Sequence, residues 1–172
     1  IHLVESVEDV SELKIDNSMN VAYVTQTTLS IDDTQTIMDS LKIRFPEIHG
    51  PKTNDICYAT QNRQDSVKQL ALECDLVLVI GSVNSSNSNR LREIAERGGV
   101  DSYLIDSLED LDHKWLEGRS VIGITSGASA PEHLVRELVA LLQDKYSCSL
   151  YGEKERADEG ISFRLPKGLR TS

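Results

Sequence analysis

The sequence predicts an α/β fold made of parallel-sheet units with flanking helices. Short β-rich apolar runs alternate along the chain with longer amphipathic segments, which is the pattern of strands followed by helices. The apolar runs are continuous, as expected for strands that are buried on both faces of a parallel sheet. A hydrophobic content of 39% over 172 residues is enough for a packed core.

Four apolar runs are expected to form strands because they are rich in Val, Ile and Tyr. They cover residues 20–25, 76–81, 102–106 and 120–125. Five polar-apolar segments are expected to be helical, and they cover residues 7–14, 31–44, 61–74, 88–98 and 130–144. In the third of these helices an apolar face repeats at i, i+3, i+4 and i+7, through Val67, Leu70, Ala71 and Cys74.

The best internal boundary is the segment PEIHGPKTND at 46–55, which has two prolines, a glycine and a polar run. We therefore expect residues 1–53 to be the C-terminal part of one α/β unit, and residues 54–145 to be a complete unit. Residues 146–172 are charged and mixed in composition and are expected to form a C-terminal arm. Since the chain starts at Ile1, inside an apolar run, we expect it to be a fragment.

The net charge of -10 argues against a broad nucleic-acid or membrane surface, because such a surface needs clustered Lys and Arg. A single anionic ligand is still compatible with this charge, since a local site can oppose it. The longest apolar runs fall short of the roughly 18 residues that a membrane span requires. The first residues also lack the features of a signal peptide, and a cytoplasmic location is expected.

Three loops that follow predicted strands share one chemistry. Their sequences are TQTTLSIDD, GSVNSSNSNR and TSGASAPEH, and each is rich in Ser, Thr or Asn and leads into a helix. Such loops lie at the carboxyl edge of a parallel sheet, where helix N-termini present free N–H groups to anions. Short hydroxyl and amide side chains add neutral donors. This combination fits a diphosphate.

The same polar residues are also ordinary helix caps. Ser30 with Asp32 and Asp33, or Ser129 before Pro131, would be expected in any α/β protein. The SSNSN run goes beyond this interpretation, because one cap needs only one side chain. It is therefore the strongest of the three candidate anion-binding loops.

Cys57 is the cysteine with a functional setting, because it precedes a predicted helix whose N-terminus would favour the thiolate. A buried structural role is equally compatible with its local sequence. Cys74 and Cys148 are expected to be structural, and the wide spacing of the three excludes a disulfide framework or a complete zinc site. Arg63 and its polar neighbours are read equally well as ligand-orienting or as exposed side chains at the start of a helix.

Four motifs together resemble the 4-hydroxy-3-methylbut-2-enyl diphosphate reductase (LytB/IspH) family. They are TQTTLSIDDT (25–34), IHGPKTNDICYATQNRQ (48–64), VIGSVNSSNSNRL (79–91) and GITSGASAPEHLV (123–135). Their order and spacing match the family, and the similarity weakens only after about residue 145.

The resemblance implies three similar α/β units in a pseudo-threefold arrangement around a central 4Fe-4S cluster, with one cysteine ligand from each unit. Cys57 matches the third of these cysteines. Thr27 matches a catalytic and substrate-binding threonine near the leaving hydroxyl group. The diphosphate-binding residues of the family are matched by Ser85, Ser86, Asn87 and Ser129.

The implied reaction belongs to non-mevalonate isoprenoid biosynthesis. It removes the hydroxyl group of 4-hydroxy-3-methylbut-2-enyl diphosphate with two electrons and two protons, and it yields isopentenyl and dimethylallyl diphosphate. An external donor such as ferredoxin or flavodoxin is implied as the source of electrons. The other two cluster cysteines, the substrate-binding histidines and a glutamate proton donor would lie in a missing N-terminal half. The fragment alone is therefore expected to be inactive.

Two other functions remain compatible with the residues. An anion- or phosphosugar-binding α/β module with a structural cysteine would explain the polar loops, although it leaves the order of the four motifs unexplained. A thiol-based redox protein could use Cys57, but the sequence offers no resolving cysteine near it.

Overall fold

The computed structural model of the chain describes residues 1–16, 20–51 and 56–151. The chain divides into two compact units, Ile1–Leu138 and Val139–Ser172. The first unit contains the sheet and every residue that the sequence singles out for function. The boundaries predicted at residues 53 and 145 stay predictions.

The first unit holds a three-stranded parallel sheet with the strand order β2-β1-β3. The strands are β1 (Leu76–Ile80), β2 (Asp101–Ile105) and β3 (Ile122–Ser126). All five residues of the central strand β1 are buried, which confirms the parallel sheet expected from its continuous apolar run. At the carboxyl edge, Ile80 pairs with Ile105 on one side and with Ser126 on the other.

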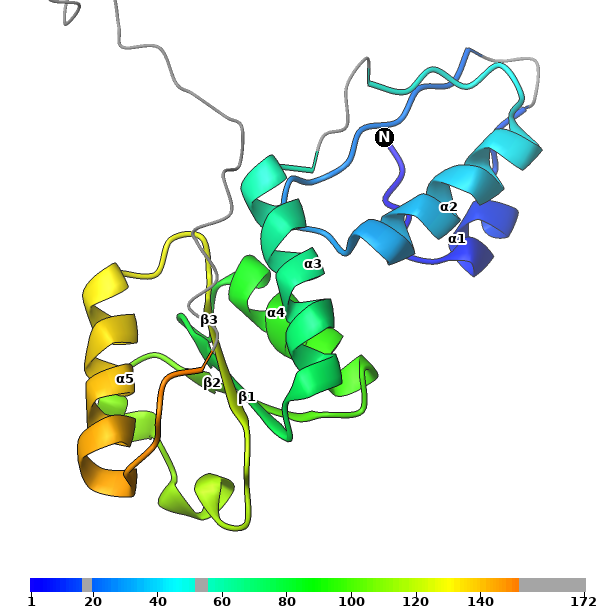
Figure 1. Cartoon of the computed structure of the whole chain (residues 1–172). Helices are drawn as coiled ribbons and strands as arrows, with labels where there is room; N and C mark the ends of the chain where they lie inside the picture. The colour runs from blue at the N-terminus through cyan, green and yellow to red at the C-terminus, as the bar shows by residue number, and fades with distance from the viewer. Residues whose placement is uncertain (17–19, 52–55, 152–172) are drawn as a thin grey trace, which may run out of the picture. The chain divides into compact units, whose positions relative to one another are not determined.

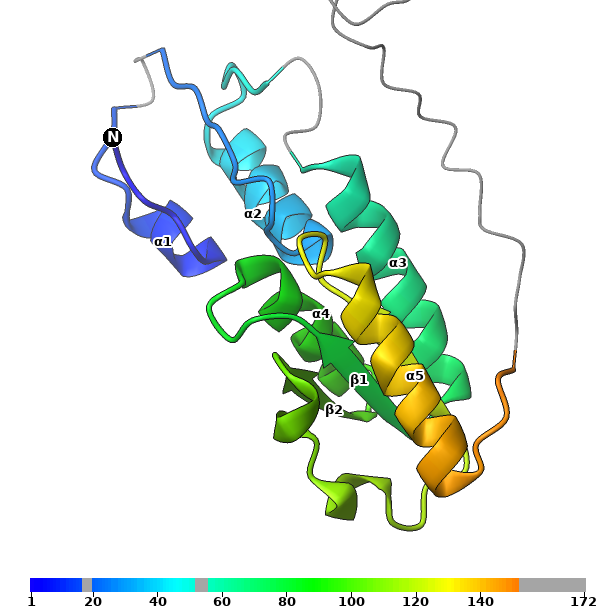
Figure 2. The ribbon, with the colours of Figure 1, turned by 90° about the vertical axis from the view of Figure 1, so that its left-hand side faces the viewer.

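The described residues form five α-helices, of which the third and fourth pack against this sheet (Figures 1 and 2). They are α1 (Val7–Glu12), α2 (Ile31–Arg44), α3 (Tyr58–Glu73), α4 (Ser86–Arg97) and α5 (Glu132–Tyr146), of which α5 continues into the second unit. Two short 3-10 helices, Leu108–Asp110 and His113–Leu116, follow β2. Among the described residues, none of the helices has the length and apolar character to cross a membrane.

Two apolar clusters of described residues lie in the first unit. One joins α3, α4 and the central strand, with Val67, Val79 and Leu91 fully buried in it. The other lies between α1 and α2 and is built around Val10, Leu41 and Phe45. Burying such side chains is the main favourable term in folding, at about 1.5–3 kcal/mol for each Val, Leu or Phe.

The prediction of a strand at residues 20–25 is wrong. That segment makes only an isolated parallel bridge, Ala22 with His49, flanked by backbone hydrogen bonds of 2.9 Å. Val21 and Tyr23 pack against the cluster of α1 and α2, whereas Val24 is 86% exposed. The apolar run therefore reflects burial of one side of an extended chain, and a single bridge cannot build a ladder.

The predicted helix boundaries differ most at α3. This helix starts at Tyr58, three residues before the expected position, so that Cys57 becomes its N-cap. By contrast, α2 occupies the predicted range. Its N-cap Ser30 accepts a hydrogen bond from the Asp33 N–H, and Lys42 and Arg44 lie in its last turn, where cations are favourable.

Candidate functional site

The site is built at the carboxyl edge of the sheet, where loops leave β1 and β3. The Gly81 N–H donates to the Ile105 carbonyl at 2.9 Å, and the Gly127 N–H donates to the Ile80 carbonyl at 2.8 Å. These two bonds extend the strand pairing into the loops. The SSNSN and GASAP loops therefore start from fixed positions next to each other.

Cys57 lies at the N-terminus of α3 with an exposed side chain. Its side chain makes no capping hydrogen bond, so the thiol is not used to stabilise the helix. Its backbone N–H donates to the Thr27 carbonyl at 3.2 Å. The structure thus joins the cysteine to the TQTT loop, and it excludes the buried structural role that the sequence left open.

A second contact joins the TQTT loop to the SSNSN loop. The Thr28 hydroxyl donates to the Ser86 hydroxyl oxygen at 3.2 Å. Thr27 and Ser86 are exposed, and Thr28 is half-buried. Thr28 escaped the sequence reasoning, because nothing in TQTT distinguishes the threonine that faces the neighbouring loop from the one that faces solvent.

Gln64 fixes the end of the TQTT loop from α3. Its amide is 1% exposed, donates to the Leu29 carbonyl at 2.8 Å and accepts from the Ile31 N–H at 3.2 Å. Sequence reasoning missed this residue. The available signal was its position three residues before Val67, which continues the buried face of α3 with a polar side chain.

Ion pairs hold the start of α2 against the neighbouring helices. Both carboxylate oxygens of Asp33 accept from Arg97, at 2.8 and 3.0 Å, and Arg90 lies 3.5 Å away. The hydrogen bond and positive charge of Arg97 lower the pKa of Asp33. Lys68 pairs with Asp32 at 2.8 Å. These groups are partly exposed, so each pair contributes at most about 1 kcal/mol.

The SSNSN loop forms the N-terminus of α4. Ser85 is the N-cap, and its hydroxyl oxygen accepts from the Ser88 N–H at 3.3 Å. Asn87 is only 6% exposed, yet neither its Nδ2 nor its Oδ1 has a hydrogen-bond partner among the described residues. A buried amide without a partner is unfavourable by about 1–3 kcal/mol. A ligand that supplied partners would remove that cost.

The GASAP loop places Ser129 two residues beyond Gly127, with an exposed side chain. A turn forms here, in which the Ala130 N–H donates to the Gly127 carbonyl at 3.0 Å. Arg63 donates from Nε to the Ser126 carbonyl and from Nη1 to the Ala59 carbonyl, both at 3.2 Å. Arg63 thereby links α3 to the end of β3, so its role is to fix the backbone beside the loop.

Of the remaining cysteines, Cys74 is the C-cap of α3, at the opposite end of that helix from Cys57. Cys74 packs against the core, where burial and the charges of Glu73 and Asp75 raise the pKa of its thiol. Cys148 is half-buried in the second unit, and the histidines are exposed. Within residues 1–16, 20–51 and 56–151, no group of three His, Cys, Asp or Glu side chains could hold a metal ion.

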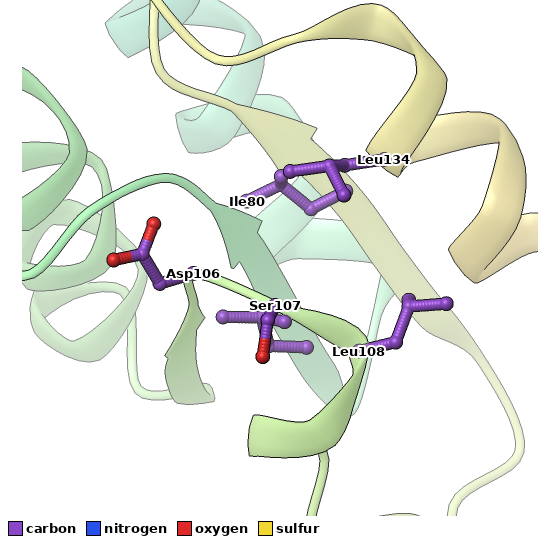
Figure 3. A pocket seen from close by; sticks show the side chains of 6 residues that line it. Ile80, Asp106, Ser107, Leu108 and Leu134 are labelled. Carbon is purple, nitrogen blue, oxygen red and sulfur yellow. The ribbon is translucent and has the colours of Figure 1, made fainter.

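A small, mostly apolar hollow lies near this edge (Figure 3). It has an empty volume of about 150 Å³ and is lined by Ile80, Ile105, Asp106, Ser107, Leu108 and Leu134. None of the predicted site residues lines it. This hollow is therefore distinct from the candidate site.

The fold and the site define an α/β protein whose polar loops and exposed cysteine gather at the carboxyl edge of a parallel sheet. Residues 1–143 match the sequence profile of the family described as "LytB protein". The chain belongs to this family, as the four motifs had predicted.

Relatives with a known name are similar over nearly the whole chain. Proteins named 4-hydroxy-3-methylbut-2-enyl diphosphate reductase from Ectopseudomonas mendocina (strain ymp) and Saccharophagus degradans are 58% and 59% identical over 170 residues. Each alignment covers 99% of this chain and 54% of the relative. The chain thus spans about half the length of the curated relatives it matches.

Solved structures agree with this assignment. The E-1-hydroxy-2-methyl-but-2-enyl-4-diphosphate reductase from Plasmodium falciparum superposes with a TM-score of 0.85 at 37% identity, over 97% of this chain and 53% of that one. A structure of (E)-4-hydroxy-3-methyl-but-2-enyl diphosphate reductase, described as the terminal enzyme of the non-mevalonate pathway, gives a TM-score of 0.50 at 33% identity. It covers 81% of this chain and 48% of that one.

Proposed function

We propose that this chain supplies one cluster ligand and part of the diphosphate site of a 4-hydroxy-3-methylbut-2-enyl diphosphate reductase. The observation that carries the proposal is the convergence of three motifs at one edge. The backbone N–H of Cys57 donates a hydrogen bond to the Thr27 carbonyl, and the Thr28 hydroxyl donates one to the Ser86 hydroxyl. The cysteine, the TQTT loop and the SSNSN loop therefore meet. The 58% identity to a protein of that name supports the same assignment.

The residues present fit a 4Fe-4S cluster to which this chain contributes one of several ligands. Cys57 has an exposed thiol that caps no helix, and iron-sulfur clusters are held by such thiolates. One thiolate cannot hold four irons, so the other ligands would come from the upstream half that the relatives carry. When bound, the cluster would pass on electrons from ferredoxin or flavodoxin and act as a Lewis acid toward the substrate hydroxyl group.

The diphosphate would lie against the N-terminus of α4 and the GASAP loop. Ser85, Ser86 and Ser129 offer hydroxyl donors, and Asn87 offers an amide without a partner among the described residues. The free N–H groups at the start of α4 add to these donors. Neutral donors of this kind bind phosphate oxygens without requiring Lys or Arg side chains, which suits a chain with a net charge of -10.

Thr27 is proposed to hold the substrate hydroxyl group. Its side chain is exposed, and its carbonyl accepts a hydrogen bond from the backbone N–H of Cys57, the residue that would bind iron. At this position the threonine hydroxyl can hydrogen-bond the leaving oxygen. That hydroxyl group would take one proton and depart as water, while the second proton and the two electrons would form a new C–H bond on the allyl group. The carbon skeleton is released as isopentenyl or dimethylallyl diphosphate. Proton delivery from the missing half would be required, so we expect the chain alone to be inactive.

The same proposal includes a cytoplasmic location, which rests on the sequence. An anion-binding module with a structural cysteine is less compatible with the structure, because Cys57 is exposed and packs in no core. A thiol redox role is also weaker, since Cys74 lies at the far end of the 16-residue helix that Cys57 precedes.

The test is to fuse this chain to the upstream half of the Ectopseudomonas mendocina relative and prepare the protein without oxygen. We expect about four iron and four sulfide per fusion protein, a brown colour, and turnover of the hydroxylated diphosphate with reduced ferredoxin. The chain alone should contain neither iron nor sulfide. A folded fusion that contains no cluster would contradict the proposal.

A further inference from the structure

Ser88, in the first turn of α4, is enclosed by two glycines. Its side chain is 1% exposed. A Cβ atom placed on Gly81 or on Gly127 would lie 2.2 Å from the Ser88 hydroxyl oxygen, which is closer than non-bonded atoms approach. Gly81 follows β1 and Gly127 follows β3, so the hydroxyl group of Ser88 is held where the two loops begin.

Ser88 makes two hydrogen bonds to the same atom. Its backbone N–H donates to the Ser85 hydroxyl oxygen at 3.3 Å, and its own hydroxyl donates to that oxygen at 3.0 Å. A hydroxyl group has two acceptor lone pairs and one donor hydrogen. Among the described residues the buried Ser88 hydroxyl has no acceptor other than Ser85, so the bond runs from Ser88 to Ser85 and the Ser85 hydrogen is left to donate in another direction.

We propose that Ser88 is a positioning residue that fixes Ser85 as a hydrogen-bond donor toward a bound diphosphate. This inference rests on the proposed function and adds a residue to it. The ionised oxygens of a diphosphate accept hydrogen bonds, so a serine whose hydrogen is directed outward matches them. Holding that hydroxyl in place before binding also reduces the entropy lost when the anion binds.

A second observation on the same turn points to a ligand. Asn87, next to Ser88, is only 6% exposed. Its side-chain amide has no hydrogen-bond partner in the described part of the chain. The Cβ position of Gly127 lies 3.7 Å from its Nδ2. An oriented donor and an unpaired amide thus occur together beside the same glycine.

The enclosure itself can be tested by substitution. Gly127→Ala should destabilise the fold, because the new Cβ would meet the Ser88 hydroxyl at 2.2 Å. Adding Ser88→Ala should relieve the clash, since the next contact, to the Ser88 Cβ, is 3.4 Å. For Gly81 that distance is 2.8 Å, so Ser88→Ala should not rescue Gly81→Ala. Thermal unfolding of the four variants measures this pattern, and equal rescue at both glycines would contradict the geometry.

The positioning role is tested with inorganic diphosphate on the full 172-residue chain, followed by amide chemical shifts. Ser85→Ala should weaken binding about tenfold, as expected for the loss of a hydrogen bond to a charged group. Ser88→Ala should weaken it about threefold, and the double variant should bind no worse than Ser85→Ala alone. Ser82→Ala, in the same loop, is the matched control and should bind like the unaltered chain.

The outcomes separate this inference from the proposed function. A tenfold effect of Ser85→Ala with no effect of Ser88→Ala would overturn the positioning role and leave the diphosphate site intact. An undiminished effect of Ser88→Ala in the Ser85→Ala chain would also overturn it, because Ser88 would then act independently. If the unaltered chain does not bind diphosphate, the same variants are compared in the fusion protein described above, and a folded fusion protein that does not bind it would contradict both the proposed site and the role of Ser88.

Discussion

The two edges of the sheet differ in whether their polar groups are paired with one another. At the amino edge, the Asp75 carboxylate accepts from the Ser120 and Val121 N–H groups, each at 2.8 Å. Arg119 donates to the Asp75 carbonyl at 2.8 Å and also forms an ion pair with Asp101. Polar groups at the starts of all three strands are thus paired with one another, which holds the strands in register.

At the carboxyl edge, several polar side chains are exposed or have no hydrogen-bond partner among the described residues. The side chains of Cys57, Thr27 and Ser129 are exposed, and the buried amide of Asn87 has no partner among the described residues. This difference is the one expected if the amino edge serves stability and the carboxyl edge binds the diphosphate, as proposed above. Substitutions at the two edges should therefore separate stability from function.

The largest effect is expected for Cys57→Ala in the fusion protein described above. The cluster should be lost completely, because the remaining ligands cannot complete the site. The melting temperature of the 172-residue chain should not change, since the side chain is exposed and caps no helix. Cys148→Ala is the control and should keep the cluster. Iron analysis and the visible spectrum measure both, and full iron content in Cys57→Ala would refute the assignment of this ligand.

A smaller effect, with opposite signs for stability and binding, is expected for Asn87→Leu. Replacing an unpaired buried amide by an apolar side chain of similar size should raise the free energy of unfolding by about 1–2 kcal/mol. It should also weaken diphosphate binding at least tenfold, to the extent that the amide donates to the anion. Urea unfolding and a diphosphate titration measure the two. Loss of stability would show that the amide has a partner within the fold.

At the amino edge the expected change is in stability alone. Asp75→Ala removes the acceptor of two backbone N–H groups and should lower the melting temperature of the chain. Diphosphate affinity should stay the same, because the change lies at the other end of the strands. Asp144→Ala, an exposed substitution in α5, is the control. A change in affinity that exceeds the change in the control would show that the edges are coupled.

The smallest expected effect is a change in the free energy of unfolding with pH in the acidic range. Hydrogen bonds from the Ser120 and Val121 backbone lower the pKa of Asp75 below its ordinary value of 3.8. The folded state therefore gains stability from the ionised carboxylate above pH 3.8 and loses it as the pH falls through the lowered pKa. Asp33 contributes in the same direction because of Arg97. Asp75→Asn should flatten the dependence below about pH 4, and an unchanged slope would contradict this role.

Much of the fold could be predicted from local sequence. The central strand reads as a continuous apolar run, and α2 carries a serine cap at its start and basic residues at its end. The segment 20–25 misled the prediction, because an apolar run reports burial and does not report which strands are available for pairing. Cys57 was placed correctly before a helix, although the helix begins closer to it than expected.

The motifs pointed to only some of the residues around the candidate site, although Gln64 and Ser88 also stand within them. Ser85, Ser86, Asn87 and Ser129 stand in loops whose composition is unusual. Gln64 and Ser88 were missed because their roles depend on partners distant in sequence. Gln64 bonds to Leu29, 35 residues away, and the space around Ser88 is set by Gly127. Such contacts follow from tertiary packing, which the local pattern does not contain.

The most direct test of the contrast between the edges is a titration of the isotope-labelled chain with inorganic diphosphate, read at each backbone amide. We predict shifts at the carboxyl edge, at Ser85, Ser86, Asn87 and Ser129, with the amides of Ser120 and Val121 unmoved. Shifts concentrated at the amino edge, or spread evenly over the chain, would contradict a binding site at the carboxyl edge.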